Sequence, residues 1–430
     1  MFCGGEPVLE NEAINELIGV DESYKASDVL LSKLTDKKQK IELFNAFLDR
    51  ESDLSFDWFT DYFQEEHSDR KNKKQDFTPD GVVTLVSFLL GATSSNADIC
   101  AGTGGLTIKR WSENKEASYY CEEFSDRALP FLLFNLAIRN INATVFHGDS
   151  LSRQVKHLYK LTAGEKYSDI QTVDSLDADK FQTVVMNPPY SFKWNPTADT
   201  IEDARFKPYE ALAPKSKADY AFLLTGLDRL ADNGTMAIIL PHGILFRGQT
   251  EEKIRRRLIE LNQLEAVIGL PEKLFLNTDI PTVVLILKKH RDTTDVLFID
   301  ASKDFTKGKN HNYLETVHVK RVLDTYKRWC SSDRYSSVVT FDDMKENDFN
   351  LNIPRYVDTF EPVKVKPLAE IVKDMQETDR QIQKNANDFL LMLDQLTSRD
   401  PQTEKELKDL VSYWRDKYGT KKGQQTRLPI

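Results

Sequence analysis

The sequence lacks most of the features that mark metalloproteins, disulfide-rich proteins and membrane proteins. Its four cysteines, at positions 3, 100, 121 and 330, have no paired spacing, which argues against a zinc site and a disulfide framework. The seven histidines form no His-Glu-x-x-His motif, so no metal site is expected. No run approaches about 18 apolar residues, and the N-terminus lacks the basic start and apolar core of a signal peptide. We therefore expect a cytoplasmic protein that does not bind a membrane.

Positive charge is also in deficit. The chain holds 58 lysines and arginines against 68 aspartates and glutamates, which gives a net charge of −10. Basic runs occur at residues 70–74, 253–257 and 421–422, but runs of this kind are more often solvated surface than binding sites. Because binding to a polyanion depends on neutralising its phosphates, the net negative charge argues against a protein that binds nucleic acid unaided.

The most informative segment is Asn187, Pro188, Pro189 and Tyr190, which follows the apolar run 181–186. Two prolines fix two φ angles and remove two backbone donors, so a strand that reaches them must end with outward carbonyls. The Asn187 side-chain oxygen and the Pro188 carbonyl can then accept from one NH2 group, while Tyr190 offers a flat face to a ring. This arrangement suits an exocyclic amine. The alternative interpretation is an ordinary Pro-Pro turn after a strand.

A glycine-rich turn follows an earlier apolar strand. Glycine tolerates positive φ and has no Cβ, so the backbone amides that open the following helix can face a ligand. The turn lacks the full dinucleotide-binding fingerprint, whose third glycine comes three residues after the second. The candidate residues from this strand and turn are Asp98, Cys100, Ala101, Gly102, Thr103, Gly104 and Gly105.

Two further apolar strands end in acidic residues. Residues 117–121 lead into Glu122 and Glu123, about 20 residues after the glycines, where nucleotide-binding α/β folds place a ribose-binding carboxylate. Residues 144–146 lead towards Asp149. Each segment that carries candidate ligand-binding residues therefore follows a strand. Helix-like stretches separate most of these strands. This order predicts an α/β fold with a doubly wound, Rossmann-like sheet whose ligand edge carries these residues.

From about residue 75 to about residue 357 the chain resembles S-adenosylmethionine-dependent adenine-N6 DNA methyltransferases, in particular the modification (M) subunit of type I restriction-modification systems. The sequence departs from the family pattern at Ile99–Ala101, where the family has Pro-Ala-Cys, and at His242, where it has asparagine. Besides the two motifs above, the resemblance lies in the segments Gln75–Pro79, Leu240–Gly248, Val267–Pro271, Asp279–Thr282, Leu297–Ser302 and Asn350–Val357.

The resemblance implies a role for each matching residue. It implies S-adenosylmethionine as cofactor, with Glu123 at the ribose hydroxyls and Asp149 at the amino group of the cofactor adenine. It implies double-stranded DNA as substrate, with residues 187–190 at the target adenine and Phe246 on the other face of that base. Along the methionine part of the cofactor it places Phe77, Thr78 and Pro79, and around the cofactor it places Asp98 and the loop to Gly105.

The residue types in the motif also limit the possible mechanism. Since an asparagine cannot accept a proton, we expect direct in-line attack of the amine on the sulfonium methyl, with the proton lost during or after transfer. The target adenine must first be extruded from the duplex, which costs a few kcal/mol and is offset by stacking on Tyr190 and Phe246.

The length suits two to three domains. We expect an N-terminal helical region at 1–75, a catalytic domain at 76–357 and a C-terminal helical extension at 358–430. The extension contains a long helix with an apolar stripe from Leu368 to Leu396 at spacings of three and four, which favours a partner surface. The alternative is that this helix folds back on its own catalytic domain. The resemblance implies a specificity (S) subunit as the partner of this helix, with a restriction subunit as a further partner.

Other functions fit parts of the pattern. A stand-alone DNA adenine methyltransferase would share every motif. Methyltransferases that modify a glutamine amide of protein release factors share residues 187–190 and the glycine loop, but the sequence beyond residue 240 argues against that class. An RNA-base methyltransferase would be expected to carry a basic appended module. A cofactor-binding scaffold without activity would be expected to lose Asn187, a loop glycine or Glu123, and all are present.

Overall fold

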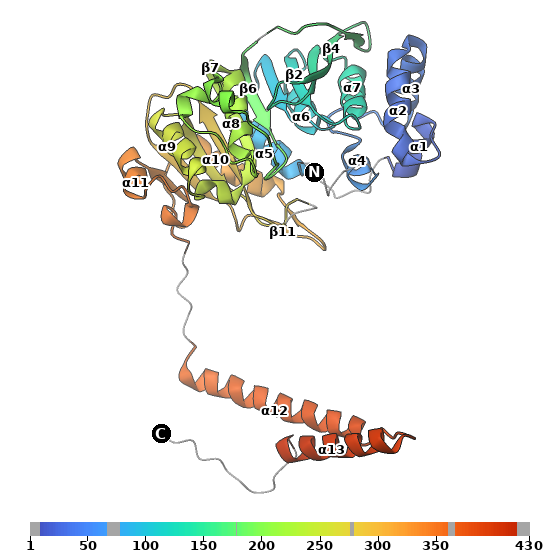
Figure 1. Cartoon of the computed structure of the whole chain (residues 1–430), viewed down its shortest axis with the longest axis vertical. Coiled ribbons are helices and arrows are strands. Elements are labelled where there is room, and N and C mark those ends of the chain that lie inside the picture. The colour runs from blue at the N-terminus through green and yellow to red at the C-terminus, as the bar shows by residue number, and fades with distance from the viewer. Residues whose placement is uncertain (1–8, 67–77, 178, 276–278, 360–365, 419–430) are drawn as a thin grey trace. The chain divides into compact units, whose positions relative to one another are not determined.

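The computed structural model describes residues 9–66, 78–177, 179–275, 279–359 and 366–418. The chain divides into two compact units (Figure 1), Met1–Thr359 and Phe360–Ile430. This division lies close to the domain boundary expected at 357/358, whereas the boundary expected at 75/76 lies outside the described residues, as do Phe77 and the basic runs 70–74 and 421–422.

The centre of the first unit is an 11-stranded sheet with the strand order β13-β10-β8-β9-β7-β6-β1-β2-β3-β4-β5. The central strands are buried on both faces and rich in Val, Ile and Leu, as expected for strands covered by helices on both sides. The strands are β1 (Ser95–Ile99), β2 (Ser118–Glu123), β3 (Ala143–Gly148), β4 (Val155–Thr162), β5 (Asp169–Thr172), β6 (Phe181–Met186), β7 (Leu230–Pro241), β8 (Leu264–Gly269), β9 (Thr282–Lys288), β10 (Val296–Asp300) and β13 (Ser336–Val339).

Strands β3, β2, β1, β6 and β7 run parallel to their neighbours in that order. The register aligns Asp98 of β1 with Cys121 of β2 and Val185 of β6, so these strands end level with one another. The carboxyl ends of β1, β2, β3 and β6 therefore meet at one edge, the position at which open α/β sheets bind ligands. The predicted doubly wound α/β fold is confirmed.

Helices cover both faces of the sheet. Helices α5, α6, α7 and α10 pack on one face, and α8, α9 and α11 pack on the other. Alternate residues of β2 show this division, because Tyr120 lies in the core under α8 while Tyr119 and Cys121 lie in the core under α7. The helices are α5 (Asp80–Leu90), α6 (Gly105–Glu113), α7 (Leu129–Ile138), α8 (Asp219–Arg229), α9 (Thr250–Glu260), α10 (Thr316–Arg328) and α11 (Phe341–Glu346).

The N-terminal helices share a core with the sheet. They are α1 (Asn11–Ile18), α2 (Ala26–Thr35), α3 (Lys37–Arg50) and α4 (Thr60–Glu66). Helix α7 is fully buried and all of its residues except Asn135 are apolar, because these helices cover the side of it that faces away from the sheet. Phe44 and Phe47 pack edge-on against the ring of Phe134, with centroid distances of 5.0 and 4.8 Å respectively. This packing fixes the N-terminal region to the catalytic sheet.

The second unit is a pair of helices, α12 (Leu368–Leu393) and α13 (Pro401–Tyr418). Only the first of them was predicted. The C-terminal third of α12 packs on α13, where Phe389 meets Trp414 edge-on at 4.9 Å and Asp394 pairs with Arg415 at 2.6 Å. The expected apolar stripe is thus divided: its C-terminal part is partly covered within the unit, while Leu368 remains 76% exposed.

None of the helices that the structure describes has the length and apolar character needed to cross a membrane.

Candidate active site

A cavity of about 140 Å³ lies at the carboxyl ends of β1, β2, β3 and β6. Ten of the predicted site residues line it: Thr78, Cys100, Ala101, Gly102, Gly105, Glu123, Asp149, Asn187, Pro188 and Pro189. It is also lined by residues that the sequence did not single out: Thr60, Leu106, Phe124, Ser125, Ser150, Phe192 and Phe222. The glycine loop and the Asn-Pro-Pro segment therefore share one cavity.

The glycine loop has an unusual backbone. Cys100, Gly102 and Gly104 all have positive φ, at 70°, 60° and 99°. A non-glycine residue in this region is strained, and such strain is often found at functional sites. The loop is held there because the backbone N–H groups of Cys100 and Ala101 both donate to the Glu122 carbonyl, at 3.0 and 2.9 Å. A Cβ at Gly104 would lie 3.0 Å from the end of the Leu132 side chain, which would have to shift slightly, so the positive φ is the main reason for glycine here.

The N-terminal region holds this loop from outside the catalytic motifs. The Thr103 hydroxyl donates to the Asp57 carboxylate, which also accepts from Thr60 at 2.9 Å and from the Asn135 side chain at 2.8 Å. The Asn135 side chain donates in turn to the Thr103 carbonyl at 2.8 Å. Asp57 lies in a turn with no motif around it, so the sequence carried no signal for this role.

Asp98 lies beneath the loop. Its carboxylate is buried and accepts from the Thr107 hydroxyl at 2.7 Å, and it is not among the residues that line the cavity. Burial raises the pKa of the Asp98 carboxyl to about 6. Burial also raises the pKa of the Cys100 thiol well above its usual value, so this thiol stays protonated at neutral pH. Asp98 therefore contacts the helix behind the loop.

The two adjacent glutamates at the end of β2 point in opposite directions, as successive strand residues must. Glu122 is fully buried and accepts from one nitrogen of Arg153 with both oxygens, at 2.8 and 2.7 Å. Glu123 lines the cavity, where it accepts from the Gly102 N–H at 2.8 Å and from the Ser125 N–H at 2.6 Å. Of the two carboxylates, Glu123 is the one available to a ligand.

Asp149 closes a turn at the end of β3. Its carboxylate accepts from the Leu151 N–H at 2.8 Å and from the Ser152 hydroxyl at 2.7 Å. It lines the cavity together with Ser150. These local bonds fix its orientation at the ligand edge.

The Asn187 amide is held at both ends. Its nitrogen donates to the Thr78 hydroxyl at 2.9 Å, and its oxygen accepts from the Tyr190 hydroxyl at 2.8 Å. The Tyr190 ring packs edge-on against Phe275, with centroids 5.9 Å apart. Asn187 therefore lies between the segment 78–79 that precedes α5 and its own turn.

An ion-pair chain supports the turn after this motif. Ser191 has a φ of 51°, and its N–H donates to the fully buried carboxylate of Asp219 at 2.7 Å. Asp219 pairs with Arg247 at 2.6 Å, and Arg247 also contacts Glu251 at 3.2 Å. Asp219 lies 28 residues from both Ser191 and Arg247, and nothing in the sequence predicted these two contacts, whereas Arg247 and Glu251 are four residues apart.

The same chain positions the segment that contains Phe246. Phe246 precedes Arg247, is 45% exposed and meets the ring of His242 edge-on at 5.8 Å. It does not line the cavity, and neither do Pro79, Thr103, Gly104 and Tyr190. Its predicted place on the far face of a target base stays a prediction.

Comparison with known proteins gives the family. Residues 54–364 match the family described as N-6 DNA Methylase. This chain belongs to the N-6 DNA methylase family. Among its relatives is the methylase subunit of the type I restriction enzyme MpnII from Mycoplasma pneumoniae, 29% identical over 401 residues, which are 86% of this chain and 72% of that subunit.

Further relatives of this N-6 DNA methylase are also methylase subunits. The subunit of the type I restriction enzyme MjaVII from Methanocaldococcus jannaschii is 28% identical over 78% of this chain and 57% of its own length. The type I restriction-modification system methyltransferase subunit from Streptococcus thermophilus has a solved crystal structure, which matches with a TM-score of 0.62 and 32% identity, over 82% of this chain and 81% of that one.

These findings confirm the resemblance to type I modification subunits. The chain is a DNA adenine methyltransferase of the modification-subunit type. Membership of this family also implies use of S-adenosylmethionine. The stand-alone and protein-glutamine alternatives are not favoured, because the relatives found over most of the chain are type I methylase subunits.

Proposed function

We propose that this N-6 DNA methylase transfers a methyl group from S-adenosylmethionine to the N6 amine of an adenine extruded from double-stranded DNA, within a type I restriction-modification complex. The observation that carries the proposal is that the glycine loop, Glu123 and Asn187 line the same cavity. A cofactor site and an amine-accepting site are thereby within reach of one another, as group transfer requires.

The residues at one end of the cavity fit the cofactor. Glu123 presents a carboxylate for the ribose hydroxyls and Asp149 one for the adenine amine, while the positive-φ turn at Gly102 brings backbone close to the ligand. Thr78 and Pro79 would lie along the methionine part. When bound, the cofactor supplies an electrophilic methyl group on a positive sulfur.

The residues at the other end fit the amine. Adenine N6 is a poor nucleophile because its lone pair is delocalised into the ring. Two acceptors, the Asn187 oxygen and the Pro188 carbonyl, would hold both N–H groups and favour a more tetrahedral nitrogen. Tyr190 and Phe246 would stack on the extruded base, which offsets part of the unpairing cost. Since no side chain in the motif can act as a base, the amine proton would be lost to water.

The partner proposal rests on the second unit. An apolar stripe on α12, exposed at Leu368, Met375 and Ile382, would bind the helices of a specificity subunit, which would read the DNA sequence. A restriction subunit would join the same assembly.

The decisive experiment is transfer of labelled methyl groups. The chain, together with a co-purified specificity subunit, should label duplex DNA, and digestion to nucleosides should recover the label as N6-methyladenine. Reactions with release-factor protein, with transfer RNA and without substrate serve as controls. Label on a glutamine side chain or on RNA would replace the proposed substrate, and no transfer to any of them would reject the catalytic assignment.

Glu123→Ala should weaken S-adenosylmethionine binding by about tenfold to a hundredfold, since a charge-assisted bond to the ribose contributes about 1.5 to 3 kcal/mol. Isothermal titration calorimetry measures the change. Glu116→Ala is the matched control, because Glu116 is exposed just before β2, at the opposite edge of the sheet. Equal affinities for the Glu123→Ala protein and the wild type would remove Glu123 from the site.

A further inference from the structure

A short hairpin follows β10 and projects from the first unit (Figure 1). Its strands are β11 (Thr306–Lys307) and β12 (Asn312–Tyr313), and Thr306 pairs with Tyr313. The turn is closed by the Gly308 N–H, which donates to the His311 carbonyl at 3.0 Å. Neither the motifs nor the proposed mechanism gives this segment a role.

The hairpin lies at the ligand edge of the sheet. β10 runs parallel to β8, and the segment after β8 holds the base of the hairpin, because Asn312 donates to the carbonyls of Lys273 and Glu272 at 2.7 and 2.9 Å. The same segment continues to Phe275, which packs on Tyr190 of the catalytic motif. One side of the hairpin base is thus joined to the turn that carries the catalytic motif.

The other side of the base contacts the helix that begins beside the site. A Cβ at Gly81 of α5 would lie 2.4 Å from the Leu314 carbonyl oxygen, so the two backbones are in close contact. Helix α5 begins at Asp80, two residues after Thr78, whose hydroxyl accepts from the Asn187 side chain. The hairpin is therefore anchored to both elements that position the Asn187 amide.

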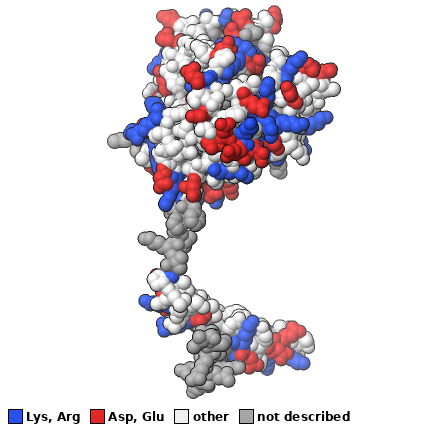
Figure 2. Space-filling view, turned by 90° about the vertical axis from the view of Figure 1, so that its left-hand side faces the viewer, with Lys and Arg blue, Asp and Glu red and all other residues white. Residues whose placement is uncertain are grey.

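The outward charge of the hairpin is positive. Lys303, Lys307 and Lys309 are exposed, and Asp304 is the one acidic residue between 302 and 314. Asp304 is buried, with bonds of 2.7 Å from Arg321 and 2.6 Å from the Tyr335 hydroxyl, so its charge is compensated inside the protein. This surface contrasts with the net charge of −10 and with the face shown in Figure 2, where acidic and basic side chains are intermingled.

The tip of the hairpin is compact. A Cβ at Gly308 would lie 2.3 Å from the Tyr313 ring and 2.4 Å from the His311 carbonyl, and the His311 and Tyr313 rings are 4.4 Å apart. The closed turn therefore presents Lys307 and Lys309 from a defined position, which lowers the entropic cost of contacting a ligand.

We propose that this hairpin contacts backbone phosphates of the DNA duplex next to the extruded adenine, through Lys307 and Lys309. The inference rests on the proposed function and adds to it a contact by which an acidic chain holds a polyanion at its active site. Phosphate contacts of this kind position a duplex without reading its sequence, so sequence recognition is left to the partner.

Lys307→Ala combined with Lys309→Ala in the full chain tests the proposal. Fluorescence anisotropy with a labelled duplex of arbitrary sequence, at salt concentrations from about 20 to 150 mM, gives the affinity and its salt dependence. The double variant should bind about tenfold more weakly and reduce the slope of log K against log salt by about 1 to 2. Lys307→Arg with Lys309→Arg should restore both values, since charge is retained.

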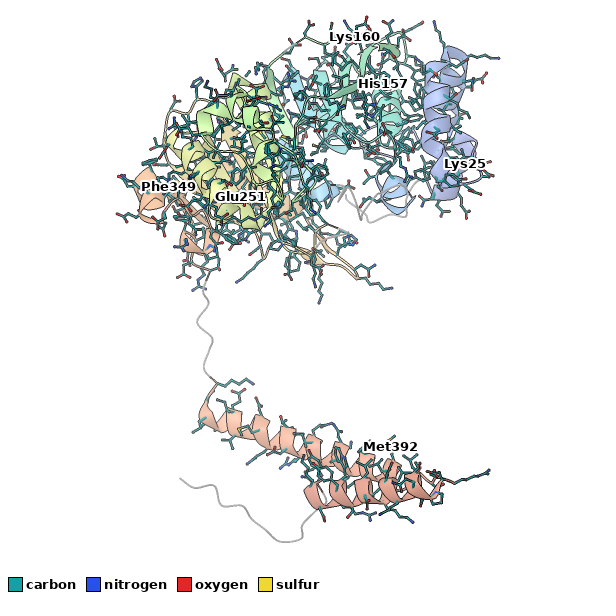
Figure 3. The ribbon with its side chains drawn as sticks, in the orientation of Figure 1. Lys25, His157, Lys160, Glu251, Phe349 and Met392 are labelled. Carbon is teal, nitrogen blue, oxygen red and sulfur yellow. The ribbon has the colours of Figure 1, made fainter. Side chains whose placement is uncertain are left out.

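Lys115→Ala with Lys160→Ala is the control of equal charge. Both lysines are exposed; Lys115 lies in the turn before β2, and Lys160 lies at the end of the unit away from β11 (Figures 1 and 3). This variant should keep the wild-type slope. If the two double variants lose affinity equally, or if neither does, the hairpin assignment is overturned. Loss of partner assembly with unchanged DNA binding would also overturn it, because Lys307 and Lys309 would then contact an acidic surface of a partner protein and not DNA.

S-adenosylmethionine affinity separates this result from failure of the proposed function. A hairpin variant that binds the cofactor normally, and whose kcat at saturating DNA is unchanged while KM for DNA rises, supports the phosphate contact. A wild-type chain that binds no cofactor would instead reject the proposed function itself.

Discussion

Asn187→Ala should abolish methyl transfer to DNA while S-adenosylmethionine affinity stays near the wild-type value. The side chain faces the proposed amine site, so its loss removes an acceptor that acts as the nitrogen changes geometry. By comparison with the removal of one oriented hydrogen-bonding group from other active sites, kcat should fall by at least about a hundredfold. Initial rates of labelled methyl transfer and calorimetry with the cofactor measure the two effects separately.

Asn233→Ala is the matched control, because Asn233 is exposed near the start of β7, at the opposite edge of the sheet. Tyr190 variants refine the result. Tyr190→Ala should be severe, since stacking on an extruded base is worth about 1 to 3 kcal/mol, while Tyr190→Phe keeps the ring and should be mild. Substantial adenine methylation by Asn187→Ala would show that residues 187–190 are only a structural turn.

Deleting residues 360–430 should preserve the fold and cofactor binding but eliminate assembly with a specificity subunit and site-specific methylation. The first unit, Met1–Thr359, is compact by itself and contains the whole cavity, so its thermal unfolding should remain cooperative. The second unit carries the exposed apolar side chains of Leu368 and Met375, at 76% and 62% exposure, which have the character of a partner surface.

Analytical ultracentrifugation with the co-expressed specificity subunit measures assembly, and calorimetry measures cofactor binding. Ile382→Glu should weaken assembly in the intact chain, because Ile382 is 49% exposed on α12. Glu370→Lys, on the same helix but already polar, is the control. Site-specific methylation by the truncated chain would contradict the prediction and favour a methyltransferase that works alone.

The sequence predicted those parts of the site in which the residues directly follow a strand that can be recognised as an apolar run. Glu123 and residues 187–190 each follow an apolar strand directly, and parallel strands bring their carboxyl ends to one edge. Strand alternation sends the side chains of Glu122 and Glu123 to opposite faces, but the apolar pattern alone did not show that Glu122 is bonded to Arg153 while Glu123 lines the cavity. Asp98 is a similar case, since its side chain contacts Thr107 behind the loop.

The parts that the sequence did not predict depend on distant contacts. Asp57 reaches Thr103 across 46 residues, and Asp219 reaches the Ser191 N–H across 28. Neither residue belongs to a motif, and each is in place only after separate elements have packed. The second C-terminal helix, α13, was missed because it has few apolar residues and packs on α12 only over part of its length.

The bond from the Tyr190 hydroxyl to the Asn187 oxygen has a consequence for base selection. An adenine that enters the proposed site brings its own N–H donor, so the oxygen exchanges one bond for another and the net cost is small. Thymine and guanine present O4 and O6 as acceptors at the corresponding edge. Either base would displace the tyrosine proton without replacing it, at a cost of about 1 to 3 kcal/mol. In the absence of substrate, the Tyr190 hydroxyl thus occupies the acceptor that the adenine amine would use. The free-energy cost of breaking this bond without replacing it would discriminate against thymine and guanine.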